Sequence, residues 1–463
     1  MVVSSLISAS VHAPASLRPR ERAWIDACRA SISASISAAI RVVVLGTTCC
    51  ASSALASTYV VDATGSPGAT FTDISTAIAA TTSGDVLKVL PGSYAPFTLD
   101  RGVVIVGYGQ VDVQGTIVVT NIGPNDRVAI VGVDAVGVSI TNCFGAVLLQ
   151  DQVCGRLFVS QCNDVRILES VFCDTTGAAN GVDAAVIEQS RVELSLVGCL
   201  GAQGASPPAS PPSSTTGGRG LHLRTGSRVF GSQLYARGGL GGDTYGTGLD
   251  AGNGGPAIRM ENATSIQLAG ANFSTSSFAY TWSRVFGGGN GKSFGGSIGG
   301  CMGFGFGACG IEAATGASGR YSNTQILGSS SSQNPSCSFP VEFPPVCGTT
   351  LVTPSSPDPT LFVLGTPIPG ATLTLQVCGA PGDVATVALG RAWVVVPTSG
   401  VDVERLVSQE RVVNLGVIPT SGVRSVTFML APSLPTGTML GLQATTNGPN
   451  GMRRSNSAPI VVR

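Results

Sequence analysis

Three consecutive segments, 124–142, 143–161 and 162–180, repeat one pattern of apolar positions, and this repeat constrains the fold more than any other feature of the chain. The three segments are equal in length, and in each of them apolar residues alternate in short runs. Repeats of about 20 residues are typical of solenoids, in which each repeat forms one coil. Stacked coils bury the alternate, inward-facing side chains in one continuous core. The sequence therefore predicts a stack of short parallel strands.

Aligning the three units residue by residue predicts which side chains lie above one another. The aligned rows are Val128 with Val147 and Arg166, Ile130 with Leu149 and Leu168, Ile140 with Val159, and Cys154 with Cys173. We expect the members of each row to lie one coil apart, on strands separated by about 4.8 Å. The rows are therefore predicted to form inward stacks.

The same strand positions recur outside the repeat, but with longer separations. Matching runs lie at 103–107, 118–121, 191–196, 228–234 and 265–268. The extra residues between the later runs predict loops inserted into the coils, at 205–218, 238–255 and 286–310. At roughly 20–25 residues per coil, residues 85–330 are expected to form about ten coils.

The stretch 70–106 predicts how the stack begins. Apolar residues recur at helical spacing from Phe71 to Ile78, so that about three turns of helix carry one apolar face. Asp73 suits the positive end of the helix dipole. Gly84 ends the helix, and apolar runs at 86–90 and 103–106 predict the first strands. An apolar helix face placed here would cover the open end of the stacked core.

The motifs Phe-x-x-Ile-x-x-Ala-Ile (71–78) and Gly-Asp-x-x-x-Val-x-Pro-Gly-x-Tyr (84–94) carry a family resemblance. They resemble the N-terminal cap and first coil of secreted bacterial right-handed parallel β-helix proteins, which have the pectin lyase fold. The resemblance implies an all-β fold, with a capping helix and a parallel β-helix domain at 57–330. Neither motif includes a catalytic residue, so the resemblance implies no particular activity.

The C-terminal part of the chain has a different pattern. Residues 331–360 are rich in Ser and Pro and predict a linker. Eight strand-like runs separated by Gly, Pro and Asn turns follow, which predicts a small β-sandwich at 361–463. The pieces G-L-Q-A-T-T-N and S-N-S-A-P-I-V-V resemble the C-terminal β-domains of many secreted proteins of environmental bacteria.

The N-terminal segment 1–56 is interpreted as a leader. An apolar run at 42–56 follows Arg41, ends in Ala-Leu-Ala and is too short to span a bilayer. This pattern predicts a secretory signal cleaved after Ala56, which places the mature chain outside the cell or at its surface. The alternative is a buried core strand. We expect no transmembrane segment in the mature chain.

Charge and metal-ligand composition exclude several classes of function. Lys and Arg total 26, as do Asp and Glu, and removal of the leader leaves 21 basic and 24 acidic residues. Nucleic-acid binding is disfavoured because there is no basic stripe. The mature chain has one histidine, His222, and no Cys-x-x-Cys pair. We therefore expect no metal site and no cofactor.

Of the 13 cysteines, ten follow the leader, and an even number in an exported chain favours disulfides. Spacing by one repeat length predicts two bridges between adjacent coils, Cys143–Cys162 and Cys154–Cys173, because a coil separation of about 4.8 Å lies within the range of Cα distances that a disulfide accepts. The competing interpretation is a stack of reduced, buried cysteines that act as small hydrophobic residues.

No catalytic constellation is apparent. The chain has no Asp-Asp pair, and its acidic residues are scattered at one or two per coil. The function predicted is therefore structural or adhesive, with contact to an extracellular polysaccharide or another cell-surface component. The alternative is a polysaccharide lyase or glycoside hydrolase acting on acidic glycans, with carboxylates assembled from different coils. The candidate residues for glycan contact gather around one insertion and are Arg237, Asp243, Tyr245, Asp250, Arg259 and Glu261.

Overall fold

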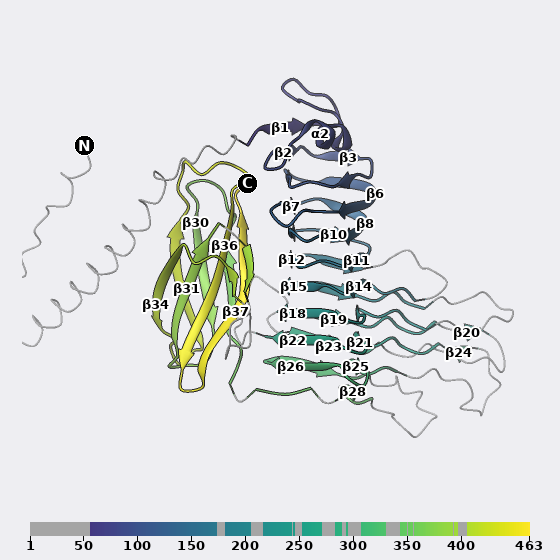
Figure 1. Cartoon of the computed structure of the whole chain (residues 1–463). Coiled ribbons are helices and arrows are strands. Elements are labelled where there is room, and N and C mark those ends of the chain that lie inside the picture. The colour runs from purple at the N-terminus through teal and green to yellow at the C-terminus, as the bar shows by residue number, and fades with distance from the viewer. Residues whose placement is uncertain are drawn as a thin grey trace, which may run out of the picture. The chain divides into compact units, whose positions relative to one another are not determined.

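In the computed structural model the chain forms a parallel β-helix followed by an antiparallel β-sandwich (Figure 1). The structure describes residues 56–173, 181–204, 216–242, 244–245, 252–270, 283–288, 293–294, 307–329, 343–349, 351–354, 356–391, 393–396 and 405–463. The predicted all-β solenoid is confirmed. The predicted signal segment lies outside the described residues, and no described helix is long and apolar enough to cross a membrane.

Each coil contributes one strand to a ten-stranded parallel sheet, called sheet A here. Its strands in order are β1 (Thr58–Val61), β2 (Val86–Val89), β5 (Val104–Gly107), β7 (Arg127–Val131), β9 (Ala146–Gln150), β12 (Asp164–Leu168), β15 (Arg191–Ser195), β18 (Arg228–Ser232), β22 (Ser265–Ala269) and β26 (Ser318–Ser322). Nine of these strands lie within residues 85–330, for which about ten coils were predicted.

The other wall of the β-helix is a sixteen-stranded sheet, sheet B, which divides into two branches. It begins with β3 (Gly92–Tyr94), β4 (Thr98–Leu99) and the long strands β6 (Val111–Thr120) and β8 (Asp134–Thr141). Branch B1 then contains β10 (Val153–Cys154), β13 (Val171–Cys173), β16 (Gly198–Leu200), β19 (Tyr235–Arg237), β23 (Ser283–Phe286) and β27 (Thr324–Leu327). Branch B2 contains β11 (Leu157–Ser160), β14 (Ala185–Glu188), β17 (Leu221–Leu223), β21 (Ile258–Met260), β25 (Ile311–Ala313) and β28 (Val346–Gly348).

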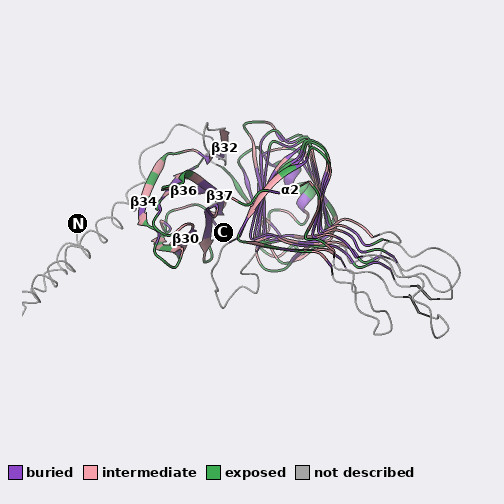
Figure 2. Ribbon diagram, turned by 90° about the horizontal axis from the view of Figure 1, so that it is seen from below, coloured by how far each residue is buried: buried purple, intermediate pink, exposed green. Residues whose placement is uncertain are grey.

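In the later coils the predicted insertions leave the stack between a B1 strand and the following B2 strand. Two of them pair with each other through β20 (Thr244–Tyr245) and β24 (Ser293–Phe294). The described parts of the insertions extend to the same side of the stack (Figures 1 and 2). β28 lies inside the stretch predicted as a linker, and it pairs in parallel with β25, so the β-helix extends beyond residue 330.

Helix α2 (Ile74–Ala80) covers the first coil, as predicted, but it is shorter than three turns. Asp73 is its N-cap, and the Asp73 carboxylate accepts a hydrogen bond from the backbone N–H of Thr76 at 3.1 Å. Phe71 lies before the helix and forms a parallel bridge with Val61. The buried face of the helix (Ile74, Ala77 and Ile78) belongs to the core of the β-helix.

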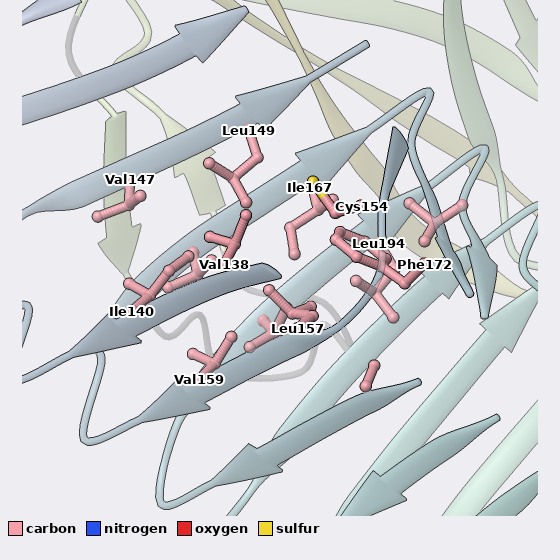
Figure 3. Packing of buried hydrophobic residues seen from close by; sticks show 14 of the residues in the cluster. Val138, Ile140, Val147, Leu149, Cys154, Leu157, Val159, Ile167, Phe172 and Leu194 are labelled. Carbon is pink, nitrogen blue, oxygen red and sulfur yellow. The ribbon is translucent and has the colours of Figure 1, made fainter. Parts of the chain in front are cut away.

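Rows of aliphatic side chains fill the interior of the β-helix (Figure 3). The predicted pairs Val128 with Val147, Ile130 with Leu149, and Ile140 with Val159 are confirmed. The next coil differs, because Val147 pairs with Val165 and Leu149 with Ile167. Along sheet A this coil is therefore one residue shorter than the repeat in the sequence. Since side chains alternate between the two faces of a strand, the shift places Arg166 and Leu168 on the outer face, not in the predicted inward rows.

The two predicted disulfides are wrong, since Cys143, Cys154, Cys162 and Cys173 are all free. The same shift explains the second pair: Cys154 is paired with Phe172, so Cys173 lies on the opposite face of its strand. Cys143 and Cys162 are both buried, and their thiols lie 3.3 and 3.2 Å from the backbone oxygens of Thr141 and Ser160. Here the competing interpretation holds: buried thiols pack in the core. A disulfide does join Cys309 to Cys347, whose Cα atoms are 6.0 Å apart.

We expect the buried thiols to resist alkylation in the native protein. Burial raises the pKa of Cys154, Cys199 and Cys378 to about 12, and the thiolate is the reactive species. Iodoacetamide at pH 8 should label these positions slowly, and rapidly after denaturation without reductant. Peptide mapping measures both rates. A disulfide-linked peptide containing any of the three would contradict this prediction.

The C-terminal strands form two antiparallel sheets that share one apolar core. The first sheet contains β29 (Thr360–Leu364), β30 (Thr372–Cys378) and β35 (Val423–Met429). The second contains β34 (Arg411–Val417), β31 (Val384–Gly390), β36 (Met439–Gly448) and β37 (Gly451–Val461). A separate hairpin, β32 (Trp393–Val396) with β33 (Arg405–Val407), carries the buried Trp393. Leu55–Leu430 and Leu434–Arg463 together form one compact unit.

The outer face of sheet A changes character along the stack. The central outward row is Val86, Val104, Ala129, Leu148, Arg166, Glu193, Phe230, Gln267 and Arg320. Its apolar first part packs with Trp393 and Val461 of the sandwich. Arg166 and Glu193, the next positions in the row, are buried, and Gln267 and Arg320 further along are half-buried. The sandwich therefore covers the early coils of this face, and part of the later coils stays accessible.

Candidate functional site

The insertions begin and end in a hydrogen-bonded layer, which we call the insertion stalk. It consists of Val182, Ala202, Gly218, Gly239, Gly255, Gly288, Ala308 and Ser329. Each of these residues after the first donates its backbone N–H to the carbonyl of the one before it, and the Gly239 N to Gly218 O distance is 2.7 Å. Outgoing and returning segments of successive coils therefore form one continuous backbone network.

Close backbone approach explains why the stalk is rich in glycine. A Cβ atom on Gly239 would lie 1.9 Å from the carbonyl oxygen of Ala202. One on Gly288 would lie 2.0 Å from the carbonyl oxygen of Gly239. No side chain fits at such distances, so glycine is required where the segments stack. The predicted glycine-rich loop at 238–255 thus begins and ends in the hydrogen-bonded layer of the insertion stalk.

The outer face of branch B1, beside the stalk, combines aromatic rings with arginines. We call Tyr235, Arg237, Arg284, Phe286 and Gln325 the aromatic–arginine face. The strand register pairs Tyr235 with Arg284, and Arg237 with Phe286. The same register pairs Arg284 with Gln325. Rings and guanidinium groups therefore alternate along and across neighbouring strands.

The side chains of this face are accessible. The rings of Tyr235 and Phe286 are tilted by 56° with centroids 6.0 Å apart, which is a favourable aromatic geometry. Arg237 and Gln325 are exposed, and Tyr235, Arg284 and Phe286 are half-buried. A hollow of about 690 Å³ adjoins the face and is lined by Arg284, Tyr321, Ser322, Asn323, Thr324, Gln325, Thr353, Pro354, Ser356 and Pro357. Ligand sites commonly have volumes of about 300–1,000 Å³.

A second polar cluster lies on branch B2, around His222 of β17. Its Nδ1 atom is 3.0 Å from Asp183 Oδ2, and its Nε2 atom is 3.0 Å from Glu261 Oε1. Arg219 Nη1 lies 3.1 Å from Asp183 Oδ2 and 3.2 Å from His222 Nδ1. Asp183 precedes β14 and Glu261 follows β21, so His222 joins carboxylates from the two neighbouring coils.

The polar groups of the His222 cluster satisfy one another's hydrogen bonds. Both carboxylates accept a hydrogen bond from the ring only when the ring carries a proton on each nitrogen. With a neutral ring, Nδ1 can accept from Arg219 while Nε2–H donates to Glu261. In either state both nitrogens are occupied, and His222 is only 4% exposed. The cluster is therefore better suited to joining coils than to transferring protons to a ligand.

The pH dependence of the free energy of unfolding should reflect the ionisation of Asp183 in this cluster. Burial alone would raise the pKa of Asp183, but hydrogen bonds from His222 and the Arg219 backbone N–H, with the Arg219 charge, hold it below its ordinary value. A lowered carboxyl pKa stabilises the fold above the unfolded pKa, and this contribution is lost as the pH falls through the folded pKa.

We expect Asp183→Asn to lower stability at pH 7 by about 2 kcal/mol, because a charge-assisted hydrogen bond is lost. Stability should then fall less steeply than in the wild type as the pH drops below about 4. Denaturant unfolding at several pH values measures both effects. Glu312→Gln, on the same outer face, is the matched control. An unchanged pH slope in Asp183→Asn would contradict the prediction.

The structure brings together only part of the predicted glycan-contact set. Arg237 belongs to the aromatic–arginine face, and Glu261 belongs to the His222 cluster. Arg259 is the strand neighbour of His222 and is half-buried. Asp243 and Asp250 lie outside the described residues, and Tyr245 is described only as part of β20.

Sequence reasoning missed Tyr235, Arg284, Phe286 and Gln325. A signal was present, because Tyr235-Ala-Arg237 and Arg284-Val-Phe286 each place a buried apolar residue between two outward ones. The alternation identifies the outward positions, but not that the two segments are neighbours. In the described part of the chain, no group of three or more His, Cys, Asp or Glu residues is placed to hold a metal ion.

The comparisons with known proteins add little. No protein-family model matches the chain. No curated protein matches it either. Among solved structures, the enzymatically active domain of tailspike protein 2 from bacteriophage CBA120 is similar at 9% identity and a TM-score of 0.24, over 84% of this chain and 73% of that one. ORF18 of Geobacillus virus E2 is similar at 12% identity and a TM-score of 0.19, over 78% and 75%. Likeness at this level supports no conclusion about function.

Proposed function

We propose that this protein is a rigid, extracellular β-helix that contacts glycans without cleaving them. The observation that carries the proposal is the aromatic–arginine face, where two rings and two guanidinium groups lie on adjacent strands beside a polar hollow. Aromatic rings stack on the apolar faces of sugars, and arginine and glutamine donate hydrogen bonds to sugar oxygens. Secretion through the N-terminal leader is part of the same proposal, supported by the apolar run at 42–56.

The fold favours a contact role because it holds these side chains rigidly. The middle strand of the face, β23, is hydrogen-bonded to β19 on one side and to β27 on the other. Ala236 and Val285, the residues between the outward pairs, are fully buried in the core. A preformed surface loses little conformational entropy when it binds a ligand, and this favours affinity.

The His222 cluster is the observation that favours a second candidate function, hydrolysis or elimination on an acidic glycan. Glu261 is its most accessible member, with 38% of the side chain exposed. Against this candidate, both ring nitrogens are occupied by neighbouring groups. Incubation with pectin, alginate and other acidic polysaccharides, with and without calcium, should therefore release no reducing or unsaturated ends. Turnover that Glu261→Gln abolishes would favour the enzyme instead.

Binding by the mature chain, residues 57–463, tests the contact role directly. A glycan array should identify ligands, and calorimetry should then show that Tyr235→Ala and Phe286→Ala each weaken binding about tenfold or more, as expected for aromatic contact residues. Phe144→Ala is the matched control, because Phe144 is an aromatic residue that is 58% exposed and lies outside this face. No binding to any glycan, or an equal loss in Phe144→Ala, would refute the proposal.

A further inference from the structure

The accessible part of the outer face of sheet A contains a hollow that differs from the aromatic–arginine face. Its volume is about 630 Å³, and it crosses strands β15, β18, β22 and β26. We call it the arginine hollow, and define it by Arg191, Arg228, Phe230, Gln267 and Arg320. None of the described residues that line it carries a carboxylate. Three arginine side chains therefore line one hollow in a chain with equal numbers of basic and acidic residues.

Carboxylates outside the hollow contact Arg191 and Arg320. Arg191 Nη1 lies 3.5 Å from Asp164 Oδ1. Arg320 Nη2 lies 3.3 Å from Asp358 Oδ1, and the same aspartate accepts a hydrogen bond from the Gln267 amide at 3.0 Å. A guanidinium group has five N–H donors, so one group can contact a carboxylate and a bound anion at the same time. Arg228 is exposed and lies directly beside Arg191 in the strand register.

The remaining lining suits a sugar. Ser265 and Ser318 line the hollow together with Gln267, and their hydroxyl and amide groups can pair with sugar hydroxyls. The parallel strands repeat these groups at about 4.8 Å, and arginine pairs well with carboxylate and sulfate oxygens. A hollow with only three arginines is too small to follow a nucleic-acid backbone, which usually needs a longer basic surface.

We propose that the arginine hollow binds a glycan segment that carries carboxylate or sulfate groups. The site is separate from the aromatic–arginine face, so it goes beyond the proposed function and can succeed or fail independently of it. Arg191, Arg228 and Arg320 contact the anionic groups, and Gln267 and the hydroxyl residues contact the sugar.

Calorimetry on the mature chain in 0.15 M NaCl tests this site with three oligosaccharides of matched length. These are an oligogalacturonate, a sulfated dextran oligomer and a neutral dextran oligomer. At least one of the two anionic probes should bind, and the neutral probe should not bind in the hollow. Arg228→Gln should weaken anionic binding about tenfold or more, as expected for a charge-assisted contact, and Arg228→Glu should weaken it further.

Controls separate this site from general electrostatic attraction and from the first proposal. Arg101→Gln removes an arginine paired with Asp100 near the first coils, and it should leave binding unchanged. Tyr235→Ala should also leave it unchanged. Arg320→Gln gives a second test, and thermal unfolding verifies that each variant is folded. Equal affinity for the neutral probe in the hollow, equal loss in Arg101→Gln, full competition by inorganic sulfate, or unaltered binding in both folded hollow variants would overturn the proposal.

Discussion

Replacing Arg166 with alanine should lower the free energy of unfolding by about 3–5 kcal/mol, the usual effect of removing one partner from a buried ion pair. The Arg166 side chain is fully buried. Its Nε and Nη2 atoms donate to the two carboxylate oxygens of Asp164 at 2.9 and 2.8 Å. Nη2 also donates to the backbone oxygen of Leu406 at 2.8 Å, and the guanidinium carbon is 4.8 Å from the centroid of the Trp393 ring. The loss would therefore affect both the β-helix and its contact with the sandwich.

Equilibrium urea unfolding, followed by circular dichroism and tryptophan fluorescence, measures this effect. Arg101→Ala is the control, because an exposed pair contributes less than about 1 kcal/mol. Equal free energies of unfolding for Arg166→Ala and Arg101→Ala would contradict the prediction.

A double-mutant cycle should show that Glu193 depends on Arg166. Glu193 is the strand neighbour of Arg166, and its carboxylate accepts hydrogen bonds from the backbone N–H and the hydroxyl of Ser457. Burial raises the pKa of Glu193, and the nearby Arg166 charge opposes that rise. Without Arg166 the buried negative charge loses one of its nearby positive charges, so Glu193→Gln should recover part of the stability lost in Arg166→Ala. Simple additivity of the two losses would show that the residues are independent.

Substituting Gly239 with alanine should destabilise the protein by about 3 kcal/mol, because the stalk must separate to admit the methyl group. The new Cβ atom would lie 1.9 Å from a backbone oxygen, which no side-chain rotation can relieve. Separation would also lengthen the hydrogen bonds that Gly239 makes with Gly218 and Gly255. The thermal unfolding midpoint and hydrogen exchange of the stalk amides measure the two effects.

Gly198→Ala is the matched control for the stalk. Gly198 lies in β16 of the same stack, and a Cβ atom there would approach no atom more closely than 3.6 Å. The control should have nearly wild-type stability. Equal stability of the two variants would show that the stalk segments are not held at the distances described.

Much of the fold was predictable because it follows from local patterns. The helical spacing around Ile74 and Ile78 predicted the cap, and alternation in the runs around Ile130 and Ile140 predicted inward-facing rows. The eight apolar runs after residue 361 predicted most strands of the sandwich. Helix and strand periodicities depend on neighbouring residues alone, so they can be read from one sequence.

The register between coils was less predictable, because it depends on turns as well as on strands. The advance per coil is not constant along sheet A, because it is 19 residues from Val128 to Val147 and 18 residues from Val147 to Val165. The assumption of a constant repeat length therefore placed Arg166 in the core and Cys173 above Cys154. Both errors have the same cause: a shift of one residue exchanges the two faces of a strand.

The candidate sites were the part of the protein least predictable from the sequence alone. Alternation in the sequence shows that Tyr235 and Arg284 point outward, but not whether they remain accessible, and it did not place Arg166 on the outer face. The sandwich covers Arg166, whereas Tyr235 and Arg284 stay half-exposed. His222 meets its two carboxylates across 39 residues in each direction, a separation set by the insertions between coils. The periodicity of a strand is a property of the chain itself, but the exposure of an outward side chain depends on which distant segment packs against it.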